Sequence, residues 1–172
     1  MCGRENDTNV AAARFRIRAA EPADNAALAR VLRCVMAEVG AAGDGSSAHD
    51  PEIDDIAGAY GVPRAAYFVV DADGTVAGGG GLGPLAGGDG ATCELRKMYL
   101  DAGARGQGLG RALLARCIET ARAFGYRRMY LETMTTMADA RRLYERHGFT
   151  PVDKPIGHTG HFGCNAWYVR AL

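Results

Sequence analysis

Lysine is scarce in this sequence of 172 residues, and neither sign of charge is in excess. The 20 basic residues comprise 18 arginines and two lysines, Lys97 and Lys154, and 20 acidic residues balance them. A chain with zero formal net charge lacks the diffuse positive field that non-specific nucleic-acid binding requires. The planar guanidinium of arginine instead suits anion contacts that are local and fixed in geometry. We therefore expect no nucleic-acid partner.

The sequence also lacks long apolar runs and a regular cysteine pattern. No stretch approaches the roughly 20 apolar residues of a membrane-spanning helix, and residues 1–13 lack the apolar centre of a secretory signal. The five cysteines are widely spaced without a CxxC pair, which favours reduced thiols. These absences predict a disordered leader over residues 1–13, no membrane partner and a cytoplasmic location.

Apolar spacing predicts strands and helices that alternate along the chain. Strands are expected at 15–19, 66–71, 75–82, 92–100, 128–133, 149–152 and 165–170, and helices at 21–40, 52–60, 108–124 and 138–147. Asp73-Gly74 is typical of a hairpin turn, and a first half rich in hairpins argues against an all-parallel sheet. The sequence therefore predicts one α/β domain over residues 14–172.

Glycine is abundant, at 24 of 172 residues, and one glycine-rich segment lies between a predicted strand and a predicted helix. It reads Arg105-Gly106-Gln107-Gly108-Leu109-Gly110-Arg111. The first amides of a helix have no intrahelical partner and attract anions, and glycines let a phosphate approach them. The flanking arginines suit bidentate phosphate contacts. The segment predicts a phosphate-binding turn, with an ordinary strand-to-helix turn as the alternative.

The spacing of this turn excludes two common phosphate-binding motifs. The run is GxGxG, whereas a dinucleotide fingerprint needs GxGxxG and a P-loop needs GxxxxGK[ST]. Two matches to the dinucleotide pattern occur between Gly78 and Ala86. Neither opens a helix, so we expect both to be chance matches in a glycine-rich hairpin.

The segment resembles the central motif of the GNAT superfamily of acyl-CoA-dependent N-acyltransferases. In that motif a strand, here Leu95-Arg96-Lys97-Met98-Tyr99-Leu100, is followed by [RQ]-x-x-G-x-[GA] at a helix start, here Arg105 to Gly110. A second family motif, A-x-x-[LF]-Y-x-x-x-G-F, matches Ala140 to Phe149. The two motifs have the family's order and separation, and the resemblance covers roughly residues 14–172.

The resemblance implies a fold and a co-substrate. It implies a single-domain α/β fold with a mixed, mostly antiparallel sheet flanked by helices. The strands at 92–100 and 128–133 would be parallel and splay apart to hold acetyl-CoA, and no metal is implied. The turn would hold the pyrophosphate, and the strand backbone would pair with the pantetheine arm. The implied cofactor-binding residues are Met98, Leu100, Arg105, Gly106, Gln107, Gly108, Leu109, Gly110 and Arg111.

The resemblance and the chemistry of acyl transfer together suggest catalytic residues. Transfer to an amine is aided by a general base and a general acid. Tyr144, at the tyrosine of the second motif, is the predicted acid, because a phenol is protonated at neutral pH; packing against Leu143 and Phe149 is the alternative. Glu94 is the predicted base, and Glu132 is the second candidate for this role.

Strand alternation predicts the surroundings of Glu94. It places Glu94, Arg96 and Met98 on one face and Lys97 on the other. Arg96 suggests an acceptor that carries a carboxylate beside its amine, such as a free amino acid. The alternative is that Glu94 is a solvated side chain paired with Arg96.

Other residues suggest how the acceptor binds. His158 and His161 are expected to line the acceptor pocket or pack locally. With Cys164 they have a spacing of three residues, but no fourth ligand is evident, so no metal site is predicted. The acids of residues 50–55 either attract a cationic amine or form a solvated helix start.

These observations predict an N-acetyltransferase that moves the acetyl group of acetyl-CoA directly to a primary amine of a small molecule. One alternative is a protein N-terminal or lysine acetyltransferase. The other is a non-catalytic acyl-CoA-binding sensor. Family members are often dimers, so a homodimer is a further expectation.

Overall fold

The computed structural model describes residues 15–172, so the predicted leader at residues 1–13 lies outside the described residues. Seven strands form one sheet in the order β1-β2-β3-β4-β5-β7-β6. Of these neighbouring pairs, β4 and β5 are parallel and the others are antiparallel. The strands are β1 (Phe15–Ala19), β2 (Ala66–Ala72), β3 (Thr75–Pro84), β4 (Thr92–Leu100), β5 (Arg128–Thr133), β6 (Thr150–Val152) and β7 (Ala166–Ala171).

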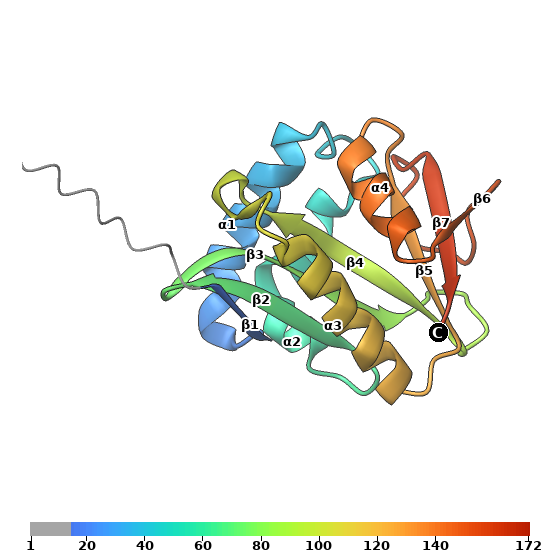
Figure 1. Ribbon diagram of the computed structural model, residues 1–172, viewed down its shortest axis with the longest axis horizontal. Helices are drawn as coiled ribbons and strands as arrows, with labels where there is room; N and C mark the ends of the chain where they lie inside the picture. The colour runs from blue at the N-terminus through green and yellow to red at the C-terminus, as the bar shows by residue number, and fades with distance from the viewer. Residues whose placement is uncertain (1–14) are drawn as a thin grey trace, which may run out of the picture.

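Helices cover both faces of this sheet (Figure 1). On one face α1 (Asn25–Glu38) and α2 (Ile56–Tyr60) pack against the sheet, and on the other α3 (Leu109–Ala123) and α4 (Ala138–Arg146) do so. Short 3₁₀ turns lie at Pro22–Asp24, Ser47–His49, Pro51–Asp55 and Ala102–Ala104. The predicted single-domain mixed α/β fold is therefore confirmed. Within the described residues, no helix is long and apolar enough to cross a membrane.

The glycine run in the middle of β3 lets an aromatic ring lie against the strand. A Cβ at Gly79 would lie 2.6 Å from Cε1 of Tyr67, and one at Gly81 would lie 2.5 Å from Cδ2 of the same ring. On the other face a Cβ at Gly80 would lie 3.1 Å from Cβ of Met98. These glycines are therefore needed for close packing at the centre of the sheet, beyond the hairpin role predicted for them.

A β-bulge interrupts β4 at Lys97. Gly79 of β3 pairs with Tyr99 and Gly81 pairs with Arg96, so β4 has one more residue than β3 in this interval. Lys97 has a φ of 49°, a conformation uncommon for residues other than glycine. Its carbonyl accepts a hydrogen bond of 2.8 Å from the hydroxyl of Tyr67, the ring that the glycines of β3 accommodate.

The bulge overturns the predicted alternation of β4. Lys97 lines the same pocket as Glu94 and Arg96, whereas Met98 packs into the core beneath α3. The prediction was wrong because an inserted residue reverses the face of every side chain that follows it. The side chains of two adjacent residues, Arg96 and Lys97, therefore lie on the same side of the sheet.

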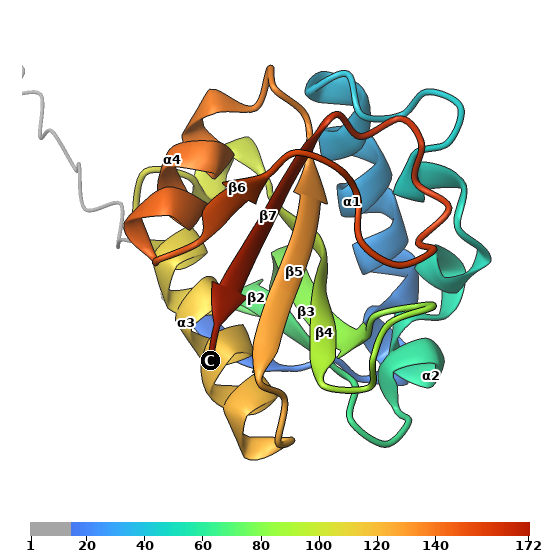
Figure 2. The ribbon, with the colours of Figure 1, turned by 90° about the vertical axis from the view of Figure 1, so that its right-hand side faces the viewer.

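The parallel strands β4 and β5 pair only where they begin. The paired positions within residues 15–172 are Thr92 with Arg128, Cys93 with Met129 and Glu94 with Tyr130. Figure 2 shows β5 between β4 and β7. Beyond Glu94 no strand of the described part of the chain pairs with the edge of β4 that faces β5, as the resemblance implied.

We expect Gly79→Ala to destabilise the protein by roughly 1–3 kcal/mol, because the new methyl group overpacks the space of Tyr67. Urea unfolding gives the free energy difference. Gly43→Ala is the matched control: a Cβ there meets nothing within 4 Å, so its effect should stay within about 0.5 kcal/mol. Equal effects of the two substitutions would refute this account of the β3 glycines.

Candidate active site

Three adjacent cavities lie along the gap between β4 and β5. The cleft, of about 690 Å³, runs between the start of α3 and α4, and the polar pocket, of about 310 Å³, lies on the α2 side. A narrow junction of about 50 Å³ lies between them. The cleft and the junction share Met98, Tyr99, Met137 and Tyr144, and the junction and the polar pocket share Glu94, Arg96, Lys97 and His161.

The start of α3 presents open backbone amides at one end of the cleft. Gly106 and Gly108 have φ values of 74° and 78°, which glycine adopts without strain. No side chain caps the helix, and its first backbone bond runs from the amide of Ala112 to the carbonyl of Gly108. The amides of residues 109–111 therefore lack intrahelical partners. This arrangement fits an anionic group such as a pyrophosphate.

Two side chains of the predicted phosphate turn brace it internally. The guanidinium of Arg105 donates to both carboxylate oxygens of Glu38, at 2.6 and 2.9 Å, and to the carbonyl of Leu100 at 2.9 Å. Gln107 donates to the carbonyl of Gly103 at 2.7 Å. The contacts that Arg105, Gln107 and the exposed Arg111 would make with a cofactor stay predictions.

The unpaired edge of β4 lines the middle of the cleft. Met98 and Leu100 both lie there, past the last residue of β4 that pairs with β5. An extended ligand could therefore add to this edge through its main-chain groups. The cleft volume falls within the range of roughly 300–1,000 Å³ that is common for ligand sites.

Tyr144 lies where the cleft meets the junction. Its ring packs edge-to-face on Phe149, with centroids 5.9 Å apart, so the packing role weighed for it is present. Its hydroxyl makes no hydrogen bond with residues 15–172. Every fully buried side-chain oxygen or nitrogen among these residues has a hydrogen-bond partner, so the hydroxyl of Tyr144 is not fully buried. The hydroxyl therefore reaches the cavity. Burial raises the pKa of Tyr144, which keeps the phenol protonated.

Glu94 lies where the junction meets the polar pocket. Its side chain is 5% exposed, and Oε2 accepts a bond of 2.7 Å from Nε of Arg96. Nη2 of Arg96 donates to the carbonyl of Pro84 at 2.6 Å. The expected pairing with Arg96 is therefore found, but the carboxylate is buried and not solvated. Oε1 has no hydrogen bond to the described chain, so it faces the cavity.

Glu132 on β5 lies across the gap from Glu94. Its side chain is 4% exposed. Oε1 accepts bonds from the hydroxyls of Tyr130 at 2.7 Å and Thr159 at 3.0 Å, and Thr159 also lies 3.0 Å from Oε2. Burial raises the pKa of Glu132, although these hydroxyls oppose the shift.

Lys97 is the best-buried charge of the site. Its side chain is 1% exposed, and Nζ lies 2.6 Å from Oδ2 of Asp50 and 2.6 Å from Oε1 of Glu52. Burial alone would raise the pKa of both carboxyl groups, but Lys97 and their other donors outweigh it and lower both values. Asp50 and Glu52 are thus bound into the site and are more than a solvated helix start.

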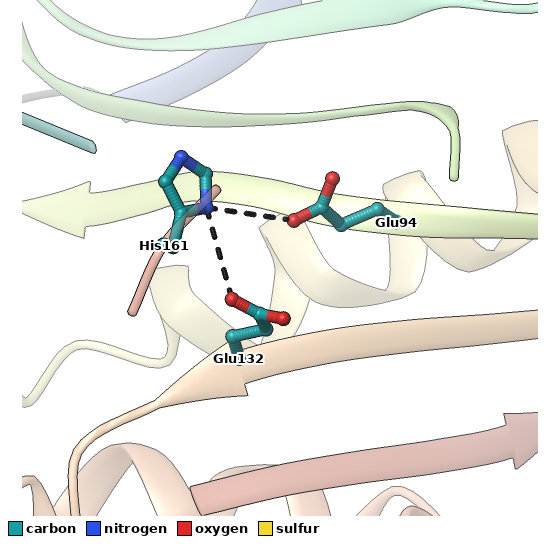
Figure 3. A group of neighbouring side chains, drawn as sticks. All are labelled: Glu94, Glu132 and His161. Atoms are coloured by element: carbon teal, nitrogen blue, oxygen red, sulfur yellow. Dashed lines mark ion pairs between the residues drawn. The ribbon is translucent and has the colours of Figure 1, made fainter. Parts of the chain in front are cut away.

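His161 joins these groups from the connection between β6 and β7. Its Nε2 lies 3.0 Å from Oδ2 of Asp50, and this hydrogen bond raises the pKa of His161. Figure 3 shows His161, Glu94 and Glu132 directed toward one another. Sequence reasoning named Asp50 and Glu52 only as an acidic cluster and assigned Lys97 to the wrong face.

The predicted histidines have different environments. His158 is exposed and lies over Gly87, where an added Cβ would be 2.3 Å from its ring. Its amide donates to the carbonyl of Ala86 at 2.7 Å, so it packs locally while Thr159 and His161 line the polar pocket. Cys164 lines the junction. No periodicity in this loop distinguishes the two histidines.

Comparisons with known proteins agree with this geometry. Residues 35–149 match the family model described as the acetyltransferase (GNAT) family. Over 150 residues, 87% of this chain and 90% of the relative, the sequence is 43% identical to the uncharacterized N-acetyltransferase YjgM of Escherichia coli.

Solved structures share the fold. A GNAT-family acetyltransferase from Staphylococcus aureus superposes with a TM-score of 0.82 at 22% identity, covering 92% of this chain and 99% of that one. YncA from Salmonella typhimurium, solved with its cofactor acetyl-CoA, has a TM-score of 0.71 at 24% identity, with 92% of each chain covered.

Asp50→Asn should destabilise the protein more at about pH 5.5 than at about pH 8.5. The pKa of His161 is raised by Asp50 above its ordinary value of 6.5. The protonated imidazole therefore adds stability that is fully present below that ordinary value and is lost as pH rises through the folded-state pKa. Each unit of upward shift corresponds to about 1.4 kcal/mol.

Urea unfolding at the two pH values measures this difference. Asp54→Asn is the control, because Asp54 is exposed and pairs with Arg33, outside the polar pocket. The charged groups around His161 are Asp50, Glu94, Lys97 and Glu132. A destabilisation by Asp50→Asn that is independent of pH would contradict the role given to the Asp50–His161 bond.

Proposed function

The chain belongs to the GNAT family of acetyltransferases, and we propose that it transfers the acetyl group of acetyl-CoA directly to a primary amine of a small molecule. Family membership makes the protein an acyltransferase that depends on acetyl-CoA as co-substrate. The acceptor, the direct transfer and the residue roles are the parts that we propose.

The observation that carries the proposal is the row of three cavities with one candidate group at each end of the junction. Tyr144 borders the cleft and the junction, and Glu94 borders the junction and the polar pocket. The cleft has the open amides and the free strand edge that suit acetyl-CoA. The polar pocket has the carboxylates that suit an amine. Reaction at the junction would therefore bring both reactants together.

In the proposed mechanism the chain supplies the proton transfers. Acetyl-CoA, when bound, supplies a thioester carbonyl and a thiolate leaving group. Glu94 accepts a proton from the amine at Oε1, because Arg96 already binds Oε2. Tyr144 donates a proton at its hydroxyl to the departing sulfur, and burial keeps it in the protonated form until then. Each such transfer contributes about 10²- to 10⁴-fold in rate.

The shape of the polar pocket supports a small acceptor. It has about 310 Å³ and includes the side chains of Glu52, Arg96 and Thr159 in its wall. The connection at residues 153–165 crosses from β6 to the segments near α1 and α2 (Figure 2). Its amide at Gly163 donates to the carbonyl of Gly45 at 3.1 Å. A protein tail would have less room beneath this connection than a small amine.

A free amino acid is one acceptor within this class. Arg96 would then bind the acceptor's carboxylate while it also holds Glu94. If Arg96→Ala keeps full affinity for the acceptor, recognition of a carboxylate by Arg96 is wrong.

Acetyl-CoA should raise the stability of the protein by about 2.7 kcal/mol at one hundred times its dissociation constant. Thermal unfolding with and without the ligand measures the shift. Coenzyme A without the acetyl group should stabilise similarly, because the cleft contacts are the same. Unchanged unfolding with both compounds would rule out the proposed binding cleft.

We expect Glu94→Gln and Tyr144→Phe each to lower kcat/KM by about 10²- to 10⁴-fold, because each removes one proton transfer. Release of free thiol from acetyl-CoA, measured over a panel of small amines and of lysine and N-terminal peptides, gives the rates. Matched controls are Glu119→Gln on the exposed side of α3 and Tyr126→Phe, whose hydroxyl binds the carbonyl of Arg64.

The same assay separates the alternatives. Turnover of peptides but not of small amines would indicate a protein acetyltransferase. A thermal shift without turnover of any acceptor would indicate a sensor. Wild-type rates in both variants would show that the two residue roles are wrong.

A further inference from the structure

We propose that Glu94, Glu132 and His161 form a three-point site for the charged ammonium group of a primary amine. This inference rests on the proposed function, since it specifies how the acceptor is held before it loses a proton. It also extends the role of the polar pocket beyond Glu94, to a carboxylate on β5 and an imidazole on the β6–β7 connection.

The three side chains surround a gap that none of them closes. Nδ1 of His161 lies 3.9 Å from Oε1 of Glu94 and 3.8 Å from Oε2 of Glu132. These separations are too long for hydrogen bonds. The ligand atoms that the three residues offer all lie within 4.8 Å of one another, and Figure 3 shows them converging.

Each residue of this site is anchored on one side and open on the other. Oε2 of Glu94 binds Arg96, and Oε1 of Glu132 binds the hydroxyl of Tyr130. The hydroxyl of Thr159 lies 3.0 Å from both oxygens of Glu132, which still leaves Oε2 acceptor capacity toward the gap. Nε2 of His161 donates to Asp50, whose carboxylate can only accept, so in the neutral imidazole Nδ1 presents a lone pair toward the gap. Three acceptors held in this way match the three N–H donors of a primary ammonium group.

The distances fit a small cation and lie between those expected around a metal ion and around an ammonium group. A tetrahedral metal with ligands at about 2.1 Å separates its ligand atoms by about 3.4 Å. An ammonium nitrogen with acceptors at about 2.8 Å in tetrahedral directions separates them by about 4.6 Å. The observed 3.8 and 3.9 Å lie between these two values and nearer to the metal value, so the assignment to an ammonium group rests on the amine acceptor of the proposed function.

The charge around the gap also favours a cation. The cationic side chains Arg96 and Lys97 are each bound to carboxylates of the same pocket. Glu132 therefore adds a buried carboxylate that no cationic side chain contacts at hydrogen-bond distance among the described residues. An ammonium group would supply the missing positive charge.

The imidazole of His161 can report this binding directly. We would follow the ring nitrogens of the four histidines by NMR in the wild-type protein, with His161→Asn to assign the signal. The probes are n-butylammonium chloride and n-butyltrimethylammonium chloride. We expect n-butylammonium to lower the apparent pKa of His161, because it occupies the Nδ1 lone pair. The trimethyl compound has no N–H donor and should leave that pKa unchanged.

A variant pair tests the contribution of Glu132. Glu132→Gln should weaken n-butylammonium binding roughly tenfold or more, since a charge-assisted bond is lost. Glu119→Gln, the same change on α3, should leave it unchanged. In the acetyl-transfer assay Glu132→Gln should raise KM for the amine and leave KM for acetyl-CoA as in the wild type.

The outcomes distinguish the ammonium site from the proposed function. The ammonium site is overturned if both probes act alike on His161, if neither acts, or if one equivalent of ZnCl₂ moves the signal while n-butylammonium does not. A selective response to n-butylammonium with no acetyl transfer to any amine would support the site and reject the proposed function. Acetyl transfer to amines without that response would reject the site alone.

Discussion

The buried contact of Lys97 with Asp50 and Glu52 links the parts of the site to one another. A lysine that is 1% exposed needs partners for its charge, since an unpaired buried cation is costly. Its two carboxylates come from the segment that leads into α2, so the contact ties that segment to β4. Asp50 in turn fixes His161. Lys97 thus holds two connections against β4: the segment before α2 directly, and the β6–β7 connection through Asp50.

The same residue determines the course of the strand. The bulge at Lys97 is held on its other side by the hydroxyl of Tyr67, and Tyr67 fits there because Gly79 and Gly81 have no side chains. A bulge bends its strand and increases the local twist, and the bulge at Lys97 follows the last residue of β4 that pairs with β5, Glu94. The glycines of β3 therefore support the bulged strand that lines the cleft, although none of them is among the lining residues.

Sequence reasoning predicted the features that depend on local pattern. The strand-and-helix order, the hairpin at Asp73-Gly74 and the family motifs were readable, and the family and fold are confirmed. The bulge was not readable, because alternation assumes a period of two and nothing in the residues around Lys97 marks an insertion. The pairing of Asp50 with His161 joins residues far apart in sequence, so it too needed the structure. The residue roles and the acceptor stay predictions.

The cleft and the polar pocket are built from elements that differ in how well they tolerate substitution. The cleft is lined mainly by residues of α1, β4, α4 and the turn that leads into α3, and these helices and this strand also carry the core, whereas His161 and Thr159 belong to a surface connection. Connections of this kind tolerate substitution and changes of length better than core elements do. Under the proposed function, substitutions in residues 153–165 would therefore change the acceptor side of the site while the elements that line the cleft stayed intact.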